Sequence, residues 1–476
     1  MSTWDNIREI AQRLVITGDL HLLTPAHLGN GDAEGLTDMS LCRDPLTGKP
    51  LLLGTSIAGA LRNYLRAYEH GHKGEETLNT AATQLFGSIK GTPEGDQSSL
   101  VVNDALADSL SVEIRDGVQI NDETRTAEDK KKYDLELLPA GTCFPLRFEL
   151  RLPKNEAQAN QLKQILALAL RGLERAEIAI GARRSRGFGR CRVSTWQATM
   201  YNLCEPAGLI AWLTAEHTGW KYKQPETRPG TSADLLGGVR ELADKRQTFQ
   251  ICATFALDSA LFVRSTDPLT THGRQPDHSH IRSSRIGTEE VQPVLPGTSL
   301  AGALRSRARR VLKTLKVRDT DKLLNGLFGA EHTTQQRDSR ASRLIVEEAC
   351  IEGGHILAQS RVAIDRFTGG AFETALFSEA PQFGGSVKLL LTVRDPQDKE
   401  KGLLLLLLKD LWTADLPLGG TSSVGHGRLC GHTAVIQNDL QEWKITAAQD
   451  NTLTIEGDTA VLEEYVQALC REMEQV

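Results

Sequence analysis

The sequence lacks a long hydrophobic run, a recognisable leader and an excess of positive charge. Its longest leucine run, residues 403–408, is far too short to span a bilayer. The N-terminus, Met1-Ser-Thr-Trp-Asp5, is polar and acidic, which is not typical of a secretory signal. We therefore expect a cytoplasmic protein with no membrane partner. Since the net charge is −6, any binding of nucleic acid must come from local basic clusters.

The familiar catalytic and metal-binding motifs are also missing. The eight cysteines are scattered, with no Cys-x-x-Cys pair and no histidine at the spacing of a zinc ligand. The sequence contains no Gly-x-Ser-x-Gly elbow, no P-loop and no His-Glu-x-x-His motif. These absences argue against a zinc centre, a serine hydrolase and a P-loop nucleotidase, and they leave buried or inert thiols as the expected role of the cysteines.

What the sequence does contain is one module written twice. The string at 54–62, Gly-Thr-Ser-Ile-Ala-Gly-Ala-Leu-Arg, returns at 297–305 with a single change of Ile to Leu. Leu85-Phe-Gly87 returns as Leu327-Phe-Gly329, and a closing Gly-x-Gly-Arg loop at 187–190 returns at 425–428. The order is kept and the offsets are nearly constant (297 − 54 = 243; 327 − 85 = 242; 425 − 187 = 238). Such colinearity indicates an internal duplication.

Each copy predicts the same order of elements, β-α-β-β-α-β. Strands are expected at 13–23, 144–152 and 190–198 in the first copy, with helices starting at Ser56 and spanning 156–176. The second copy predicts strands near 249–261, 343–351, 387–395 and 428–436, and helices at 299–316 and 399–413. The fold class is therefore α+β, as two tandem ferredoxin-like (RRM-like) domains with loop and hairpin insertions. We expect domains at 1–200 and 247–439, a linker at 201–246, and a C-terminal extension at 440–476 whose short amphipathic helix packs on its own domain or docks a partner.

The repeated Gly-Thr-Ser string is typical of a turn that leads into a helix. We expect Ser56 to cap that helix, whose apolar side is Ile57, Leu61 and Leu65. The free amides of a helix start favour an anion, and basic residues follow at i and i+4. The predicted phosphate-binding residues are Ser56, Arg62 and Arg66 in the first copy, and Ser299, Arg305 and Arg309 in the second. The alternative is an ordinary solvated charged face.

The closing loops form a second candidate for RNA binding. A glycine loop brings backbone close to a phosphate chain while arginines neutralise it. The candidates in the first copy are Gly181, Arg183, Arg184, Arg186, Gly187, Gly189 and Arg190. The second copy keeps Gly425, Gly427 and Arg428, for which a purely structural turn is the alternative. His426 stands where the first copy has Phe188, and a surface or stacking role is expected for it.

One loop aspartate has a counterpart in both copies. Asp38 precedes the first Gly-Thr-Ser string, and Asp277 lies at the matching place in the second copy. Such a carboxylate could position a metal ion, or help to deprotonate a ribose hydroxyl that attacks the adjacent phosphate. The alternative is an Asx-turn, which suits aspartates in loops.

With these motifs in order, each half resembles the RAMP superfamily of CRISPR-associated proteins, over about residues 12–200 and 248–437. The likeness is to the backbone subunits of type III effector complexes, and the tandem arrangement is similar to the double backbone protein of type III-D systems. Residues 364–370, Ile-Asp-Arg-Phe-Thr-Gly-Gly, resemble the segment that precedes the protruding hairpin of the family. Residues 118–138 resemble it only loosely, so a first hairpin of different shape is expected.

The resemblance implies partners and chemistry. It implies binding of CRISPR RNA, stacking beside other subunits of a type III complex, and displacement of one target base by each hairpin. It also implies that Asp38 and Asp277 serve metal-dependent cleavage of a complementary target RNA, with Asp267 as the fallback in the second copy, and with Mg²⁺ or Mn²⁺ bound transiently at the RNA. The expected function is thus an endoribonuclease with two cleavage sites. The alternatives are a non-catalytic RNA-binding scaffold and a metal-independent ribonuclease that processes guide RNA.

Overall fold

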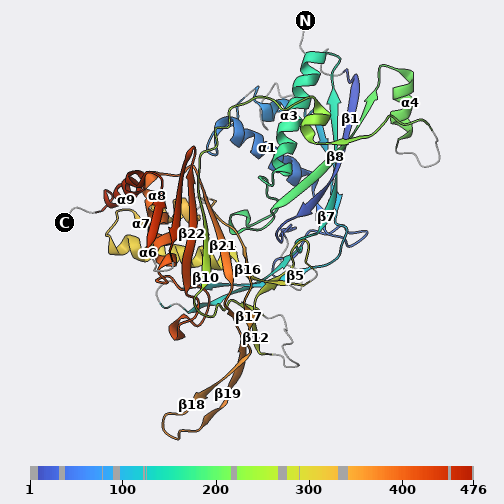
Figure 1. Cartoon of the computed structure of the whole chain (residues 1–476). Helices are drawn as coiled ribbons and strands as arrows, with labels where there is room; N and C mark the ends of the chain where they lie inside the picture. The colour runs from blue at the N-terminus through green and yellow to red at the C-terminus, as the bar shows by residue number, and fades with distance from the viewer. Residues whose placement is uncertain are drawn as a thin grey trace. The chain divides into compact units, whose positions relative to one another are not determined.

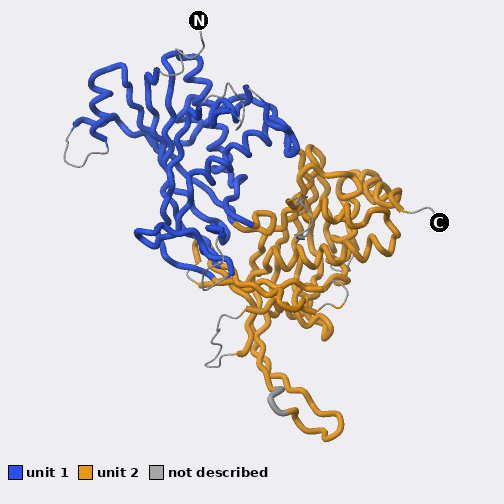
Figure 2. The backbone as a smooth tube through the Cα atoms, turned by 180° about the vertical axis from the view of Figure 1, so that it is seen from behind, with its two compact units in different colours: residues 1–113, 136–182, 189–246 blue, residues 114–135, 183–188, 247–476 orange. Residues whose placement is uncertain are grey.

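The computed structural model divides the chain into two compact units (Figure 2). Unit 1 comprises residues 1–113, 136–182 and 189–246, and unit 2 comprises residues 114–135, 183–188 and 247–476. The structure describes residues 9–31, 38–77, 79–88, 97–121, 124, 126–215, 222–265, 276–288, 290–330, 341–448 and 452–473, with the side chains of 373–375 excepted. Two segments expected in the first domain, 114–135 and 183–188, therefore cluster with the second repeat.

Unit 1 is built on an antiparallel sheet with β1 (Gln12–Leu22) at its centre. β1 pairs with β7 (Cys143–Leu152) on one side and with β8 (Cys191–Asn202) on the other. β3 (Leu100–Val102) pairs with β7, so the four strands of the repeat take the order β3-β7-β1-β8. This is the ferredoxin-like strand order, and it confirms the expected fold class.

Two helices complete the core of unit 1. α1 (Gly54–His70) buries Ile57, Leu61 and Leu65, the apolar side that its sequence predicts. α3 (Glu156–Glu174) is capped by the Asn155 side chain, and its apolar residues join the same core as the inward side chains of β7. The alternation in β7 is as expected, since Leu146, Phe148, Leu150 and Leu152 are all buried.

The expected cap of α1 is wrong. Leu53, not Ser56, occupies the N-cap position, and no side chain at that position accepts a hydrogen bond. Ser56 lies one turn further in and is exposed. The physical reason is that Asp104, distant in sequence, accepts the hydrogen bond from the Gly54 N–H at 2.6 Å. Asp104, in the loop after β3, thus accepts the hydrogen bond of the first helical amide. A serine of the helix itself is not needed as an acceptor for that amide.

Residues 201–246, expected to be a linker, contribute structure to unit 1. α4 (Pro206–Thr214) follows β8 directly, and β9 (Arg228–Gly230) pairs with β8. α5 (Ser232–Leu236) has a capping box between Thr231 and Asp234, and it packs against α3. The remaining elements of unit 1 are α2 (Ala81–Phe86), β2 (Leu51–Leu52) and β4 (Ala105–Leu106).

Unit 2 repeats the same plan. β10 (Thr248–Leu257) lies between β21 (Ser386–Arg394) and β22 (Leu429–Asn438). β15 (Leu344–Val346) and β16 (Ala349–Glu352) both pair with β21, on the side away from β10. The helices are α6 (Gly297–Thr314), α7 (Thr320–Phe328) and α8 (Asp398–Trp412). The second copy of the Gly-Thr-Ser string again starts a helix, with Pro296 at its N-cap and Ser299 inside the first turn.

The C-terminal extension packs on its own unit. β23 (Gln441–Ala447) pairs with β22, and β24 (Leu453–Glu456) pairs with β23. α9 (Thr459–Cys470) lies against α8 (Figure 1), with Tyr465 and Leu469 buried. The two helices approach so closely that a Cβ at Gly402 would lie 2.2 Å from the Tyr465 carbonyl oxygen. Of the two roles expected for this helix, the structure shows the packing one.

Each repeat carries a hairpin, and both lie in unit 2 except for the ends of the first, residues 113 and 136–137, which belong to unit 1. The first is β5 (Glu113–Ile120) with β6 (Ala127–Leu137), and the second is β18 (Gln359–Ile364) with β19 (Ala371–Ala380). The second hairpin projects from the rest of unit 2 (Figure 1). The segment 365–370 forms its tip, so the expectation that residues 364–370 precede the hairpin is wrong. At the tip the Asp365 carboxylate accepts the backbone N–H groups of Phe367 and Thr368, and this turn folds the strand back.

Two further findings concern the cysteines and the length of the helices. All eight cysteines are free thiols in the structure, which agrees with the absence of paired spacing. Among the helices of the described residues, none is long and apolar enough to cross a membrane.

Candidate nucleic-acid interface

The second loop aspartate is held at the base of the projecting hairpin. Just after Asp277, the short strand β12 (His278–His280) pairs in parallel with the end of β19. Ser378, on β19, donates to Asp277 Oδ2 from its backbone N–H at 2.7 Å and from its hydroxyl at 3.0 Å. These hydrogen bonds lower the pKa of Asp277, because they stabilise its charged form. The carboxylate is exposed, ionised at neutral pH and fixed in orientation.

A chain of polar contacts links this hairpin base to the closing glycine loop. Glu379, the neighbour of Ser378, is only 1% exposed. Its two carboxylate oxygens meet Arg264 at 3.2 Å and Arg361 at 3.4 Å. Arg361 Nη2 lies 3.3 Å from His426 Nε2.

His426 in turn lies within its own loop. Its Nδ1 is 2.9 Å from the Thr421 hydroxyl. Burial and the charge of Arg361 lower the pKa of His426, so the neutral ring is favoured at neutral pH. The surface or stacking role expected for His426 thus gives way to a half-buried position in a polar network.

The first loop aspartate has a related setting. Asp38 is exposed, and the residue after it, Met39, accepts a backbone hydrogen bond from Glu136 at the end of the first hairpin. The Glu136 carboxylate accepts the Leu41 N–H at 3.1 Å and meets Arg43 at 3.5 Å. In both repeats a glutamate of the returning hairpin strand therefore lies beside the aspartate loop.

These two glutamates were missed by the sequence analysis. Glu136 and Glu379 are separated by 243 residues (379 − 136), the offset of the Gly-Thr-Ser string, so extending the repeat would have found them. Asp44 accepts both the backbone N–H and the hydroxyl of Thr47, which is the structural turn typical of a loop aspartate. Asp267, the fallback in the second repeat, lies outside the described residues.

The described residues do not form a ready-made metal cage. Among them, no group of three or more His, Cys, Asp and Glu side chains lies close enough to share an ion. The two loop aspartates, Asp38 and Asp277, each place one carboxylate at the surface of their repeat. Mg²⁺ is commonly held by one or two carboxylates together with phosphate oxygens and water, so each of these carboxylates fits a metal shared with bound RNA.

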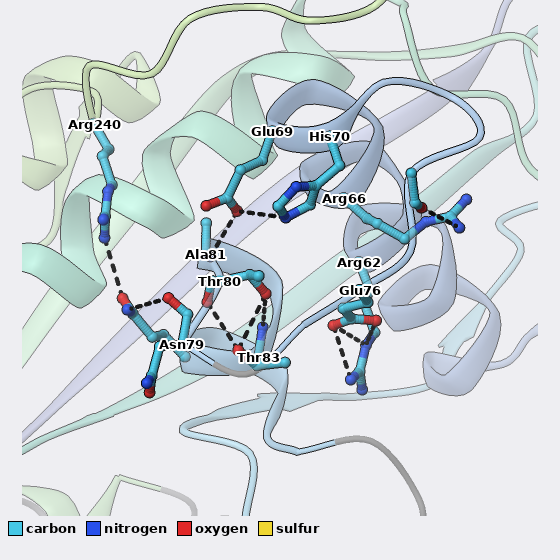
Figure 3. A network of polar contacts seen from close by, with 12 residues as sticks. Arg62, Arg66, Glu69, His70, Glu76, Asn79, Thr80, Ala81, Thr83 and Arg240 are labelled. Atoms are coloured by element: carbon cyan, nitrogen blue, oxygen red, sulfur yellow. Dashed lines mark hydrogen bonds and ion pairs between the residues drawn. The ribbon is translucent and has the colours of Figure 1, made fainter.

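The helix arginines of the first repeat bind the protein itself (Figure 3). Arg62 Nε lies 3.0 and 3.1 Å from the two carboxylate oxygens of Glu76, and its Nη2 donates to the Gly87 carbonyl at 3.1 Å. Arg66 donates to the Gly74 carbonyl at 3.2 Å and to Asn63. Arg62 thus stabilises the C-terminal end of α2, where unpaired carbonyls need donors.

The second repeat uses its arginines in the same way. Arg305 donates to the Gly329 carbonyl at 2.7 Å and to Asn325 at 2.8 Å, which stabilises the end of α7. Arg309 lies 4.0 Å from Asp321. The recurrence of Arg62 and Arg305 is therefore explained by packing of the short helix that follows. Phosphate binding by these helix arginines stays a prediction.

The two closing loops share one backbone shape. Gly181, Gly187, Gly189, Gly425 and Gly427 all have positive φ angles between 75° and 91°. A Cβ at Gly189 would lie 1.8 Å from the Ile180 carbonyl oxygen, and one at Gly427 would lie 1.9 Å from that of Leu418. The repeated Gly-x-Gly pattern is therefore required by close backbone packing, and this supports the structural alternative for the glycines.

The arginines of these loops differ in exposure. Arg184 and Arg428 are exposed, and Arg190 is half-buried. Arg183 stacks on Tyr133 of β6, with its guanidinium 4.5 Å from the ring centroid. Arg186 points inward and donates to the Phe328 carbonyl at 3.0 Å. Burial and the charges of Arg305 and Arg183 lower the pKa of Arg186 to about 10, so it stays protonated at neutral pH.

Comparison with known proteins points to one family. A family model described as the RAMP superfamily matches residues 19–192 and 254–430, one match for each repeat. The CRISPR system Cmr endoribonuclease Cmr4 of Pyrococcus furiosus is 31% identical over 118 residues, which span 25% of this chain and 38% of that protein. The CRISPR system Cms endoribonuclease Csm3 of Streptococcus thermophilus is 24% identical over 200 residues, which span 39% of this chain and 90% of that protein.

Proposed function

Because the chain belongs to the RAMP superfamily, we propose that it is an RNA-binding double backbone subunit of a type III, III-D-like, CRISPR effector complex. The single observation that carries this proposal is the pair of family matches, one on each repeat, together with two relatives named as endoribonucleases of CRISPR systems. CRISPR RNA, a complementary target RNA and other subunits of the complex are the proposed partners.

The proposed RNA grip lies on the closing loops. Arg184, Arg190 and Arg428 are exposed or half-buried beside backbone that the glycines fix in shape. Phosphate contacts of this kind hold an RNA in register without reading its sequence, which suits a protein that must accept any guide. Because Arg62 and Arg305 already bind carbonyls at the ends of α2 and α7, the helix arginines have a smaller share in this proposal.

The proposed chemistry is cleavage of the target RNA at two sites. The ribose 2′-hydroxyl attacks the adjacent phosphorus, the bond to the 5′-oxygen of the next nucleotide breaks, and that oxygen leaves with a proton. The products are a 2′,3′-cyclic phosphate and a 5′-hydroxyl. Asp38 or Asp277 would hold a divalent ion, Mg²⁺ or Mn²⁺, and would help to remove the 2′-hydroxyl proton. When bound, the ion stabilises the charge that develops on the phosphate.

The hairpins would supply the geometry for attack. In-line cleavage needs the 2′-oxygen, the phosphorus and the leaving oxygen to be aligned, and displacement of one base lets the backbone adopt that alignment. Phe367, at the tip of the second hairpin, is 98% exposed and is available to stack against a base. Asp277 lies at the base of the same hairpin, joined to it through Ser378.

The proposal is tested with the assembled ribonucleoprotein. The bound RNA is purified and sequenced, and a complementary target is then incubated with and without EDTA while cuts are mapped. We expect two cuts that EDTA abolishes, of which Asp38→Ala removes one and Asp277→Ala the other, with RNA binding kept. A complex that never cuts its target supports the scaffold alternative. Metal-independent cleavage of precursor RNA supports the guide-processing alternative.

A further inference from the structure

The two closing loops have the same backbone conformation but different surroundings. Arg183 and Thr421 open them with left-handed φ angles of 55° and 56°, a short 3-10 turn follows, and Gly187 and Gly425 end them at 85° and 91°. Around Gly187, a Cβ would lie 2.4 Å from the Glu348 backbone nitrogen. Around Gly425, a Cβ would meet nothing within 4 Å among the described residues. The first loop is therefore docked, whereas the second has no such neighbour at Gly425 within the part of the chain that the structure describes.

Within unit 2 the docked loop, residues 183–188, contacts a surface made by three elements. The Arg186 carbonyl oxygen would lie 2.3 Å from a Cβ at Gly297, the first residue of α6. The Arg186 side chain reaches the Phe328 carbonyl at the end of α7. Glu348, after β15, is fully buried and binds Arg115 of β5 and Arg285. We name Gly297, Phe328 and Glu348 the second-repeat acceptor surface.

The first repeat contains the same surface. Gly54 starts α1, Phe86 ends α2, and Asp104 follows β3, at offsets of 243, 242 and 244 residues from their counterparts (297 − 54; 328 − 86; 348 − 104). The local geometry agrees, because a Cβ at Gly54 or at Gly297 would lie 2.3 Å from the carbonyl oxygen of Val102 or Val346, respectively. Asp104 is exposed, whereas its counterpart Glu348 is buried under the docked loop and hairpin.

We propose that Gly54, Phe86 and Asp104 form a first-repeat acceptor surface, which binds an arginine-bearing glycine loop of a different protein chain. In unit 2 the docked segments bring two arginines, Arg186 for a carbonyl and Arg115 for a carboxylate. The Phe86 carbonyl and the Asp104 carboxylate are acceptors of the same two kinds. Asp104 Oδ1 already accepts the Gly54 N–H at 2.6 Å. A partner loop without arginine would bury the charge of this carboxylate without a counter-charge, which costs free energy.

A second copy of this chain does not fit that requirement. Its own undocked loop has Val424 where the docked loop has Arg186, and Val424 is 60% exposed. Its hairpin arginine, Arg361, is already paired with Glu379 of the same hairpin. The duplication therefore keeps the shape of the loop but replaces the side chain that secures it, so head-to-tail growth from copies of this chain is disfavoured. This inference does not depend on RNA cleavage.

The test is to restore the missing arginine in the full chain, without RNA. Val424→Arg and wild type are compared by sedimentation velocity over a concentration series. We expect the wild type to stay monomeric. We expect Val424→Arg to raise the constant for self-association by at least about tenfold, the value of one charged hydrogen bond. Ser423→Arg, which adds the same charge one residue away on the exposed loop, is the matched control and should behave as wild type.

A second variant locates the surface. Asp104→Arg, combined with Val424→Arg, should return the chain to the monomer, with thermal unfolding used to confirm that unit 1 is folded. The proposal is overturned if Val424→Arg stays monomeric, if Ser423→Arg associates equally well, or if Asp104→Arg leaves the association intact. Wild-type self-association that Asp104→Arg abolishes would also overturn it, because the occupant would then be a second copy.

Discussion

Ser378 and Asp277 are joined by three hydrogen bonds. The backbone N–H and the hydroxyl of Ser378 both donate to Asp277 Oδ2, and the Asp277 backbone N–H donates to the Ser378 hydroxyl oxygen. The contact joins the aspartate loop to the strand that returns from the projecting hairpin. A movement of the hairpin base would therefore shift the Asp277 carboxylate, which is proposed to serve cleavage.

Replacing Ser378 by Ala should move the pH dependence of one cut only. The backbone hydrogen bond remains but the hydroxyl is lost, so the pKa of Asp277, which both contacts lower, should rise part of the way to its ordinary value. Because the ionised carboxylate is the active form, the acid limb of cleavage at that site should shift to higher pH. The rate at each cut is measured against pH on one target RNA. The cut assigned to Asp38 is the internal control, and a shift shared by both cuts would contradict the assignment.

Glu348→Gln should destabilise unit 2 strongly. Burial alone would raise the pKa of Glu348, but the charges and hydrogen bonds of Arg115 and Arg285 outweigh it and lower that pKa. The amide keeps the shape of the side chain but leaves both buried guanidinium groups without a counter-charge, and breaking such a pair costs about 3–5 kcal/mol. Urea unfolding at neutral pH measures the loss. The exposed Glu352→Gln is the control and should change stability by less than about 0.5 kcal/mol.

The same carboxylate predicts how stability depends on pH. Its pKa is lower in the folded chain than the ordinary value of 4.5, so its contribution is complete above that value and is lost as the pH falls below it. The difference in unfolding free energy between wild type and Glu348→Gln should therefore shrink on acidification. A difference that stays constant down to the acid transition would show that the carboxylate is not held in its charged form.

Arg62 and Arg184 should separate stability from RNA binding. Arg62→Ala removes the donor to the Gly87 carbonyl and the partner of Glu76, and should cost about 1–3 kcal/mol in unfolding free energy. Arg184→Ala removes an exposed charge, and should leave stability unchanged while lowering the slope of log binding constant against log salt by about 1. Unfolding and RNA binding are measured on both variants. If Arg62→Ala lowers the salt slope by the same amount, the helix arginines also bind phosphate.

Phe367→Ala should impair handling of the target without affecting the fold. Its side chain is almost fully exposed, so the unfolding free energy should change by less than about 0.5 kcal/mol. If it stacks against a displaced base, the loss should amount to about 1–3 kcal/mol in target affinity at that position, with slower cleavage at the Asp277 cut. Leu440→Ala, an equally exposed apolar residue elsewhere on unit 2, is the control. Unchanged cleavage in Phe367→Ala would remove the hairpin tip from the mechanism.

Much of the fold could be predicted because its signals are local. The alternation of Leu146, Phe148, Leu150 and Leu152 indicates one buried face of a strand, and the structure buries all four. The repeat offset also transfers the expected helices and strands from one copy to the other, as with α1 and α6. Expectations failed where a distant residue replaced a local one, since Asp104 satisfies the Gly54 amide 50 positions away and makes a cap at Ser56 unnecessary.

The candidate site could be predicted less well than the fold. The aspartates are visible because they lie at matching places in the loops of the two copies. Their neighbours Glu136 and Ser378 come from the far strands of the hairpins. The contacts of Arg186 and Arg115 join segments that are 142 and 233 residues apart in the chain, and no periodicity reports such a pairing. The sequence shows where the arginines are, but it does not predict which residues they contact.

The strands β9 and β23 have a consequence for solubility. Each lies along the outer side of the last strand of a repeat, β8 or β22, yet the two come from unrelated parts of the chain, 201–246 and 440–476. An uncovered edge strand offers unpaired amides and carbonyls to other chains and so promotes aggregation. Because the domain is duplicated, this sheet edge occurs twice in the chain. β9 pairs with it in the first repeat, and β23 pairs with it in the second. A chain shortened after residue 439 would therefore present β22 as an open template for intermolecular β-pairing, and would be lost to aggregates before any effect on RNA could be measured.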